Sequence, residues 1–200
     1  MKRVLIVTLL LALMLTFGCS STKQVSRVAS DQVVDLSGRW NDTDSRLVSE
    51  EMVKDVVAQR WLSNFIADKG ERPVVTVGTV RNLTSEHIQT ETFIKDIQRE
   101  LINTGSVRFV AGRSEREEIR EERLEQQSYA SEATAKRLAE EIGADFVLQG
   151  SINSITDAVD GQRVIFYQVN LQLINTETNE TVWVGDKKHK KLVSQSKFKF

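Results

Sequence analysis

The chain has 200 residues, of which 40% are hydrophobic and 28% charged, and its formal net charge is −1. This is the composition of an ordinary globular protein whose core needs no disulfides. Its balanced charge lacks the strongly basic face that nucleic-acid binding requires. The single cysteine, Cys19, excludes an internal disulfide and a multi-cysteine metal site.

The first residues have the form of a secretory leader. Lys2 and Arg3 precede an uncharged apolar run over residues 4–17, which suits a signal peptide and is short for a membrane span. Gly18 directly before Cys19 resembles the lipobox of bacterial lipoproteins, which implies cleavage between these residues and acylation of Cys19. The alternative is an ordinary signal peptide, or a plain anchor, with an incidental cysteine.

These features predict three parts of the chain. Residues 1–18 form a lipoprotein signal peptide, residues 19–32 a lipidated cysteine with a flexible tether, and residues 33–200 a single globular domain. Ser20 follows the cysteine, in place of the aspartate that retains many lipoproteins in the inner membrane. By resemblance, this favours a lipid-anchored protein of a Gram-negative outer membrane that faces the periplasm.

A long amphipathic pattern opens the globular part. Apolar residues in steps of three and four predict one helix over residues 44–68, with Thr43 or Asp44 as its N-cap and Gly70 as its stop. Before it, residues 33–36 suit either a short strand or an extended arm. The aromatic side chains of this helix are expected in the core rather than in a ligand slot.

A β-branched run follows and predicts a central strand. It covers residues 72–80, with Pro73 where no ladder donor is needed. A polar loop over residues 81–89 leads into a helix over residues 90–103, which Thr90 caps and a glycine ends. A short strand over residues 107–110 would complete a crossover unit if the two strands are parallel neighbours.

Two further helices are predicted next. Ser114 opens a Ser-x-x-Glu capping box before a charged helix that ends near residue 127. Its sparse apolar positions suit either a solvated surface helix or a docking face. Residues 131–142 have the apolar spacing of another helix, and Gly143 is its stop.

The last third of the chain reads as an antiparallel meander. A strand starts near residue 145, Asp160-Gly161 signals a hairpin turn, and residues 165–173 alternate with a period of two. A third strand over residues 181–185 precedes a lysine-rich tail over residues 187–191. These lysines either contact anionic glycan or lipid headgroups or protect an exposed sheet edge.

No catalytic motif is present. The sequence lacks a Gly-x-Ser-x-Gly elbow, a phosphate-binding glycine loop and a His-Glu-x-x-His pair. Glu86 and His87 are an acid and a base side by side, but no nucleophile accompanies them. His87 is expected to hydrogen-bond its own loop or, alternatively, to contact a protein partner. The sequence therefore predicts a protein that is not an enzyme and has neither metal nor small-molecule cofactor.

Three segments of the chain resemble the LpoB family of penicillin-binding-protein activators. They are residues 35–45, DLSGRWNDTDS, residues 72–90, RPVVTVGTVRNLTSEHIQT, and residues 143–150, GADFVLQG. The resemblance implies a small α/β (α+β) domain like the N-terminal domain of TolB. Such a domain has a mixed sheet of about four to five strands and about four helices. It also implies an outer-membrane lipoprotein that activates a bifunctional class A penicillin-binding protein without catalysis of its own.

No motif fixes the docking residues. A polar loop after a core strand is a common place for function, so Asn82, Thr84, Glu86 and His87 are the expected partner-binding residues. In the alternative, these side chains only stabilise their own turn and Glu86 caps the following helix. The alternative function is a structural cell-envelope lipoprotein that binds peptidoglycan or TolB-like partners.

Overall fold

The computed structural model describes residues 24–29, 32–129 and 143–194. The chain divides into two units, residues 1–32 and residues 33–200. In the first, residues 24–29 have no secondary structure and are exposed. The expected leader, Cys19 and the predicted helix over residues 131–142 lie outside the described residues. Among those described, none of the helices combines the length and hydropathy that a membrane crossing requires.

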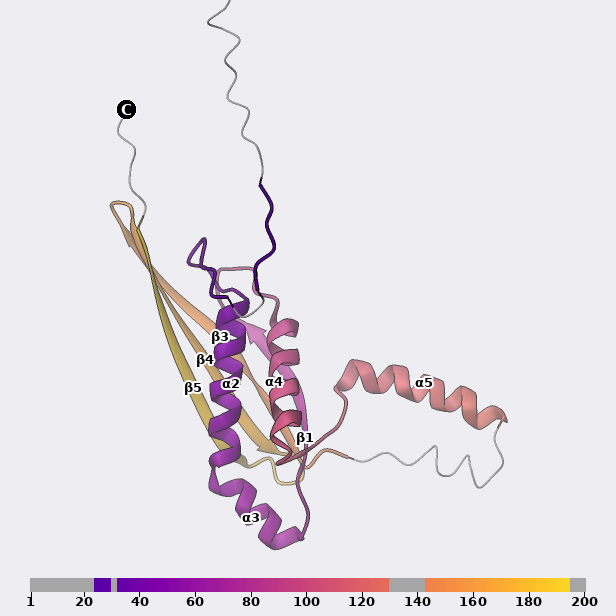
Figure 1. Ribbon diagram of the computed structural model, residues 1–200. Helices are drawn as coiled ribbons and strands as arrows, with labels where there is room; N and C mark the ends of the chain where they lie inside the picture. Colours follow the sequence, from indigo (N-terminus) through magenta and orange to yellow (C-terminus); the bar gives the residue numbers. More distant parts are fainter. Residues whose placement is uncertain (1–23, 30–31, 130–142, 195–200) are drawn as a thin grey trace, which may run out of the picture. The chain divides into compact units, whose positions relative to one another are not determined.

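The second unit is built on one mixed sheet (Figure 1). Its described elements are the helices α2 (Asp42–Ala58), α3 (Arg60–Lys69), α4 (Thr90–Thr104) and α5 (Arg113–Tyr129), and the strands β1 (Val74–Asn82), β2 (Arg108–Phe109), β3 (Phe146–Val159), β4 (Gln162–Asn175) and β5 (Thr181–Ser194). The strand order is β2-β1-β3-β4-β5. Strand β1 is parallel to β2 and β3, whereas β3, β4 and β5 are antiparallel neighbours. The predicted mixed α+β sheet, crossover and meander are therefore confirmed.

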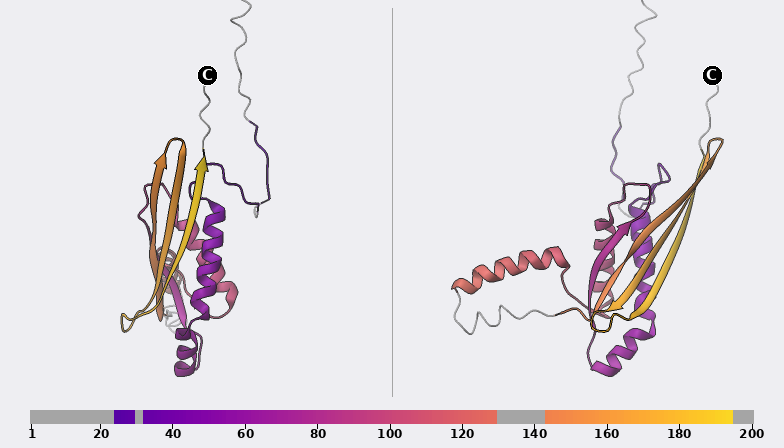
Figure 2. Two further views of the ribbon diagram at one scale, coloured as in Figure 1. Left: turned by 90° about the vertical axis from the view of Figure 1, so that its left-hand side faces the viewer. Right: turned by 180° about the vertical axis from the view of Figure 1, so that it is seen from behind.

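Helices α2 and α4 pack side by side on one face of this sheet, as the views in Figures 1 and 2 show. The core lies between them and the strands. Strand β4 contributes every second residue to it, and these five side chains are at most 1% exposed: Ile165, Tyr167, Val169, Leu171 and Leu173. The predicted alternation is thus confirmed, since successive strand side chains point to opposite faces.

The single helix predicted over residues 44–68 is wrong, because the chain breaks at Gln59. That residue is extended (φ −82°, ψ 157°) and separates α2 from α3. The indole nitrogen of Trp61 donates to the carbonyl of Val56 at 2.7 Å across the break. The break lets Trp61 and Phe65 stack edge-on against Phe146, with ring centroids 5.0 and 5.4 Å apart. Helical spacing continues through the break, so the sequence pattern conceals it.

Several element ends differ from those expected. The N-cap of α2 is Asn41, which forms a capping box with Asp44, and not Thr43 or Asp44. The residue that caps α4 is Gln89, and α5 begins before Ser114. The stop at Gly70 is confirmed by its left-handed backbone (φ 73°).

The strand ends also differ from those expected, because pairing with strands that are distant in the sequence extends them. Strand β1 continues past Val80 because Asn82 pairs with Ile152 of β3. Residues 187–191 are not a tail, since they belong to β5 and pair with β4 along its whole length. Residues 33–36 are extended and do not form a strand, and together with residues 37–40 they make up the arm that leads into α2.

Candidate functional site: a polar loop, a buried ion pair and an aromatic groove

The loop that follows β1 is shaped by its own polar side chains. The amide nitrogen of Asn82 donates to the carbonyl of Glu86 at 2.7 Å, and its oxygen accepts from the Thr84 backbone and hydroxyl at 3.0 and 2.8 Å. The Thr84 hydroxyl in turn accepts from the Glu86 backbone at 3.0 Å. Asn82 and Thr84 therefore hold a compact turn, as the structural alternative anticipated.

Glu86 joins this loop to two other parts of the domain. One carboxylate oxygen accepts from the Tyr167 hydroxyl at 2.7 Å, and the other accepts from the Trp40 backbone at 3.2 Å. Glu86 thus holds the arm and β4, and it does not cap the helix that follows. Burial, followed by the hydrogen bond to Glu86, raises the pKa of the Tyr167 hydroxyl well above its usual range.

Exposed and partly buried residues alternate along the loop. Leu83 is 55% exposed, and Ser85 and His87 are also exposed, whereas Asn82 and Thr84 are partly buried. His87 lies 2.9 Å from the side-chain nitrogen of Gln89. Among the four residues singled out from the sequence, His87 is the one that presents its side chain outward. Within this loop, some residues therefore fix the backbone conformation, and others present their side chains at the surface.

A buried ion pair, which the sequence did not reveal, lies beneath the arm. Lys191, on β5, is 7% exposed, and its ammonium lies 2.6 Å from Asp44 and 3.0 Å from Asp35. It also donates to the carbonyl of Arg39 at 3.0 Å. Asp44, itself 3% exposed, accepts from the Asn41 backbone at 2.9 Å. The buried ammonium of Lys191 thus holds the arm against the domain, although the sequence placed Lys191 in a tail.

The other oxygen of Asp44 lies 3.1 Å from a ring nitrogen of His189. Lys187, His189 and Lys191 share the side of β5 that faces the helices, because they alternate along the strand with exposed lysines. The sequence predicted the start of β5 over residues 181–185 but took residues 187–191 for a tail. Among the described residues, no group of three or more His, Cys, Asp or Glu side chains is arranged to hold a metal ion.

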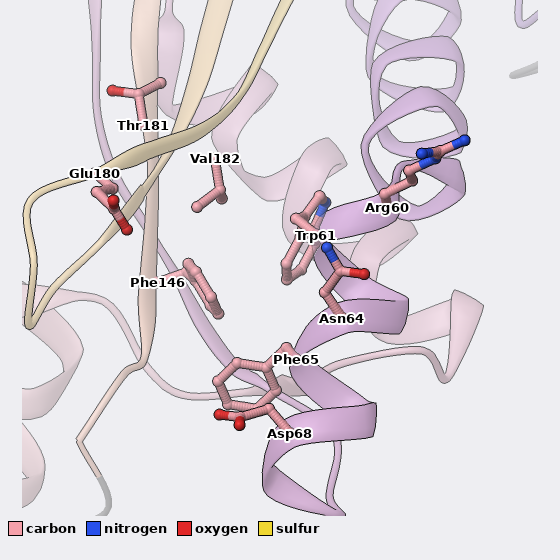
Figure 3. A pocket seen from close by; sticks show the side chains of 9 residues that line it. All are labelled: Arg60, Trp61, Asn64, Phe65, Asp68, Phe146, Glu180, Thr181 and Val182. Carbon is pink, nitrogen blue, oxygen red and sulfur yellow. The ribbon is translucent and has the colours of Figure 1, made fainter.

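An aromatic groove lies where α3 meets the start of β3 and β5 (Figure 3). Its volume is about 680 Å³, and its lining residues are Arg60, Trp61, Asn64, Phe65, Asp68, Phe146, Glu180, Thr181 and Val182. Trp61 and Phe146 are 8% and 3% exposed, which confirms the core role expected for the tryptophan. The rim carries one arginine and two carboxylates. The groove is therefore an apolar floor with a mixed-charge border.

Comparison with known proteins identifies a family whose model matches most of the domain. The model of a family described as peptidoglycan-synthase activator LpoB matches residues 44–189, which run from α2 into β5. The sequence matches none of the curated proteins with which it was compared.

Several solved structures are similar to this chain. The C-terminal domain of LpoB from Salmonella enterica is 20% identical, with a TM-score of 0.37, and the match covers 64% of this chain and 91% of that chain. For the NMR structure of E. coli LpoB the identity is 16%, the TM-score 0.39 and the coverage 90% and 85%. For lipoprotein GNA1162 from Neisseria meningitidis the values are 15%, 0.35, 63% and 88%.

Proposed function

Because this chain belongs to the LpoB family of peptidoglycan-synthase activators, we propose that it binds a class A penicillin-binding protein and raises its rate of peptidoglycan synthesis. The observation that carries the proposal is the family match over residues 44–189, which includes the helices and strands from α2 to β5. In this proposal the chain acts by binding and not by catalysis, and both oxygens of the Glu86 carboxylate are engaged by Tyr167 and Trp40.

The proposed location is the periplasmic side of the outer membrane, with acyl chains on Cys19. The support is the sequence around Cys19, an apolar run that ends in glycine, cysteine and serine. Several acyl chains together hold a protein far more firmly than one. Because the arm is bonded to the domain through Ser37, Arg39 and Asp35, the free tether is limited to the residues before the arm.

The proposed docking surface is the loop that contains Asn82, Thr84, Glu86 and His87. Asn82, Thr84 and Glu86 contribute by fixing the shape of the loop through their internal bonds. His87 and the neighbouring Leu83 contribute exposed side chains. A loop fixed in this way binds with little loss of conformational freedom, which favours affinity.

The mechanism is allosteric. Docking can shift the synthase toward its active state only by the difference between the affinities for its two states. Coupling free energies of this kind are about 1–3 kcal/mol, which corresponds to about 5- to 150-fold in an equilibrium. We therefore expect the polymerisation rate of the purified synthase to rise severalfold when the mature protein is added.

The test combines binding and rate. The mature protein is incubated with each purified class A synthase of the same cell, and complex formation and glycan-chain polymerisation are measured. The variant with Leu83→Ala and His87→Ala should bind about tenfold more weakly, whereas Lys69→Ala, on exposed α3, should match the parent. Failure to bind any synthase, or binding without a change in rate, would refute the proposal. Co-sedimentation with purified sacculi in the absence of a synthase would favour a structural envelope role instead.

A further inference from the structure

Exposed apolar side chains gather on the outer face of the β3–β4 hairpin and the neighbouring end of β5. Ile155, Val159 and Leu192 are 68%, 67% and 67% exposed, and Val164 and Phe166 are partly buried. Ile155 pairs with Phe166, and Val164 pairs with Leu192, so these side chains share one face. We call these five residues the hairpin patch. Contiguous apolar patches on soluble proteins commonly mark a surface that another partner covers.

The hairpin patch faces away from the helices. In strand β4, Tyr167 and Ile165 point into the core, so the intervening Phe166 and Val164 point to the opposite side. Figures 1 and 2 show that the hairpin continues beyond the ends of α2 and α4. Glu86 reaches Tyr167 from the helix-covered side. The patch and the proposed docking loop therefore belong to opposite sides of the sheet and can be occupied at the same time.

The N-terminal arm is bonded to this same hairpin. A guanidinium nitrogen of Arg163 donates to the carbonyl of Ser37 at 3.2 Å, and Lys191 donates to that of Arg39 at 3.0 Å. Between them, Gly38 adopts a left-handed backbone (φ 68°), and a Cβ there would collide with Val193. Arg163, Lys191 and Val193 alternate along their strands with the patch residues Val164 and Leu192, so the arm lies on the helix-covered face of these strands, opposite the patch.

The tether predicted from the sequence runs from Cys19 to the start of the arm at residue 33. A random coil of that length spans roughly 20 Å, and a fully stretched chain spans at most roughly 50 Å. Lipid on Cys19 would keep residue 33, where the arm starts, within this distance of the bilayer. Confinement of this kind gives a weak surface contact a high effective concentration.

The chemistry of the patch suits a lipid interface. Phe166 and the branched aliphatic side chains supply apolar area, and the exposed Lys190 lies next to Phe166 in the register of β4 and β5. Lysines beside apolar residues are attracted to anionic headgroups and extend their charge into water. Two acidic residues lie on the same face: Asp157 pairs with Val164 in the register of β3 and β4, and Asp186 lies farther along β5, where it pairs with Lys188 at 3.2 Å.

We propose that the hairpin patch rests on the surface of the membrane that holds the acyl chains of Cys19. This inference rests on the proposed lipid anchor and not on the proposed synthase partner. In this arrangement the membrane is a second contact that sets the orientation of the domain, and the docking loop is turned away from the lipid.

The experiment uses the lipidated protein in vesicles of phosphatidylethanolamine and phosphatidylglycerol (3:1). Cys19 is the only cysteine and is acylated in the proposal, so a cysteine introduced by Val159→Cys takes a fluorescent label uniquely. Brominated lipids quench a label that touches the bilayer. The matched control is Glu177→Cys, in the exposed turn at the opposite end of β4. We expect quenching of the Val159→Cys label to exceed that of the control at least about twofold.

A second variant tests the patch itself. Ile155→Asp with Leu192→Asp changes two exposed side chains, so it should preserve the fold, which circular dichroism checks. It should reduce quenching of the Val159→Cys label to the control level. Equal quenching at the two label positions would overturn the inference, and so would an unacylated Cys19 in the mass spectrum. A change in the fluorescence of the Val159→Cys label that follows the density of protein on the vesicles, and not the content of brominated lipid, would overturn the inference. It would indicate that a second copy of the chain covers the patch. No synthase is present, so failure here leaves the binding test above unaffected.

Discussion

Replacement of Lys191 by methionine, Lys191→Met, tests whether the buried ion pair holds the arm to the domain. Methionine keeps the length and apolar stem of the side chain and removes the charge. Asp44, 3% exposed, would lose its partner at 2.6 Å, and the carbonyl of Arg39 would lose its donor. Removal of one member of a buried pair commonly costs about 3–5 kcal/mol, because the remaining charge stays uncompensated.

The expected cost lies at the lower end of that range. Asp44 keeps the backbone hydrogen bond from Asn41 at 2.9 Å and its contact with His189 at 3.1 Å. A loss of about 3 kcal/mol would lower Tm by about 6–12 °C in a domain of this size. Urea unfolding followed by circular dichroism gives the free energy of unfolding from the midpoint and slope.

Two controls decide what the loss means. Lys190→Met removes the neighbouring lysine from the exposed side of β5 and should leave the unfolding midpoint unchanged. The double variant with Asp44→Asn should be less destabilised than the sum of the single variants, by at least about 1 kcal/mol. If Lys191→Met unfolds at the same urea concentration as Lys190→Met, the ion pair does not hold the arm and the reasoning fails.

Two further predictions concern the core of the sheet. Tyr167→Phe leaves the Glu86 carboxylate without its donor at 2.7 Å and should cost about 1–3 kcal/mol in urea unfolding. Because the pKa of Tyr167 is raised in the fold, its contribution is complete below pH 10, where tyrosine in the unfolded chain ionises. It is lost as pH rises above that value, so parent and variant should converge in alkaline urea titrations, and a constant gap would contradict this. Gly150→Ala places a Cβ against the carbonyl of Asn170 in β4 and should cost about 1–3 kcal/mol, whereas Gly143→Ala, with open space around it, should unfold like the parent.

Features that depend on local backbone chemistry were predictable from the sequence. The strand of residues 165–173 was evident from its alternation, and Gly70 and Gly105 end helices in the left-handed region because they lack a Cβ. The turn at Asp160 and Gly161 has φ values of 46° and 82°, as the Asp-Gly pair indicates. Each of these follows from a few consecutive residues.

Features that depend on distant contacts were not predictable. The break at Gln59 serves a stack of Trp61 on Phe146, which no local pattern encodes. The charge pair of Lys191 and Asp44 joins residues 147 positions apart. Within the candidate loop, the sequence correctly indicated polar side chains that bond their own turn. It gave no sign that Glu86 reaches Tyr167, because that contact depends on the final packing of the sheet.

The position of β5 has a consequence for the time course of folding. Trp183 donates to Asp55 of α2 at 2.9 Å, and Lys191 meets Asp44 at 2.6 Å, so the last strand completes the environment of the first helix. Contacts between such remote segments form slowly, because a long loop must close before they stabilise anything. A chain that is produced from its N-terminus therefore cannot complete this domain until almost all of its residues are present. Only then can β5 pair with β4 and form its contacts with α2 and the arm.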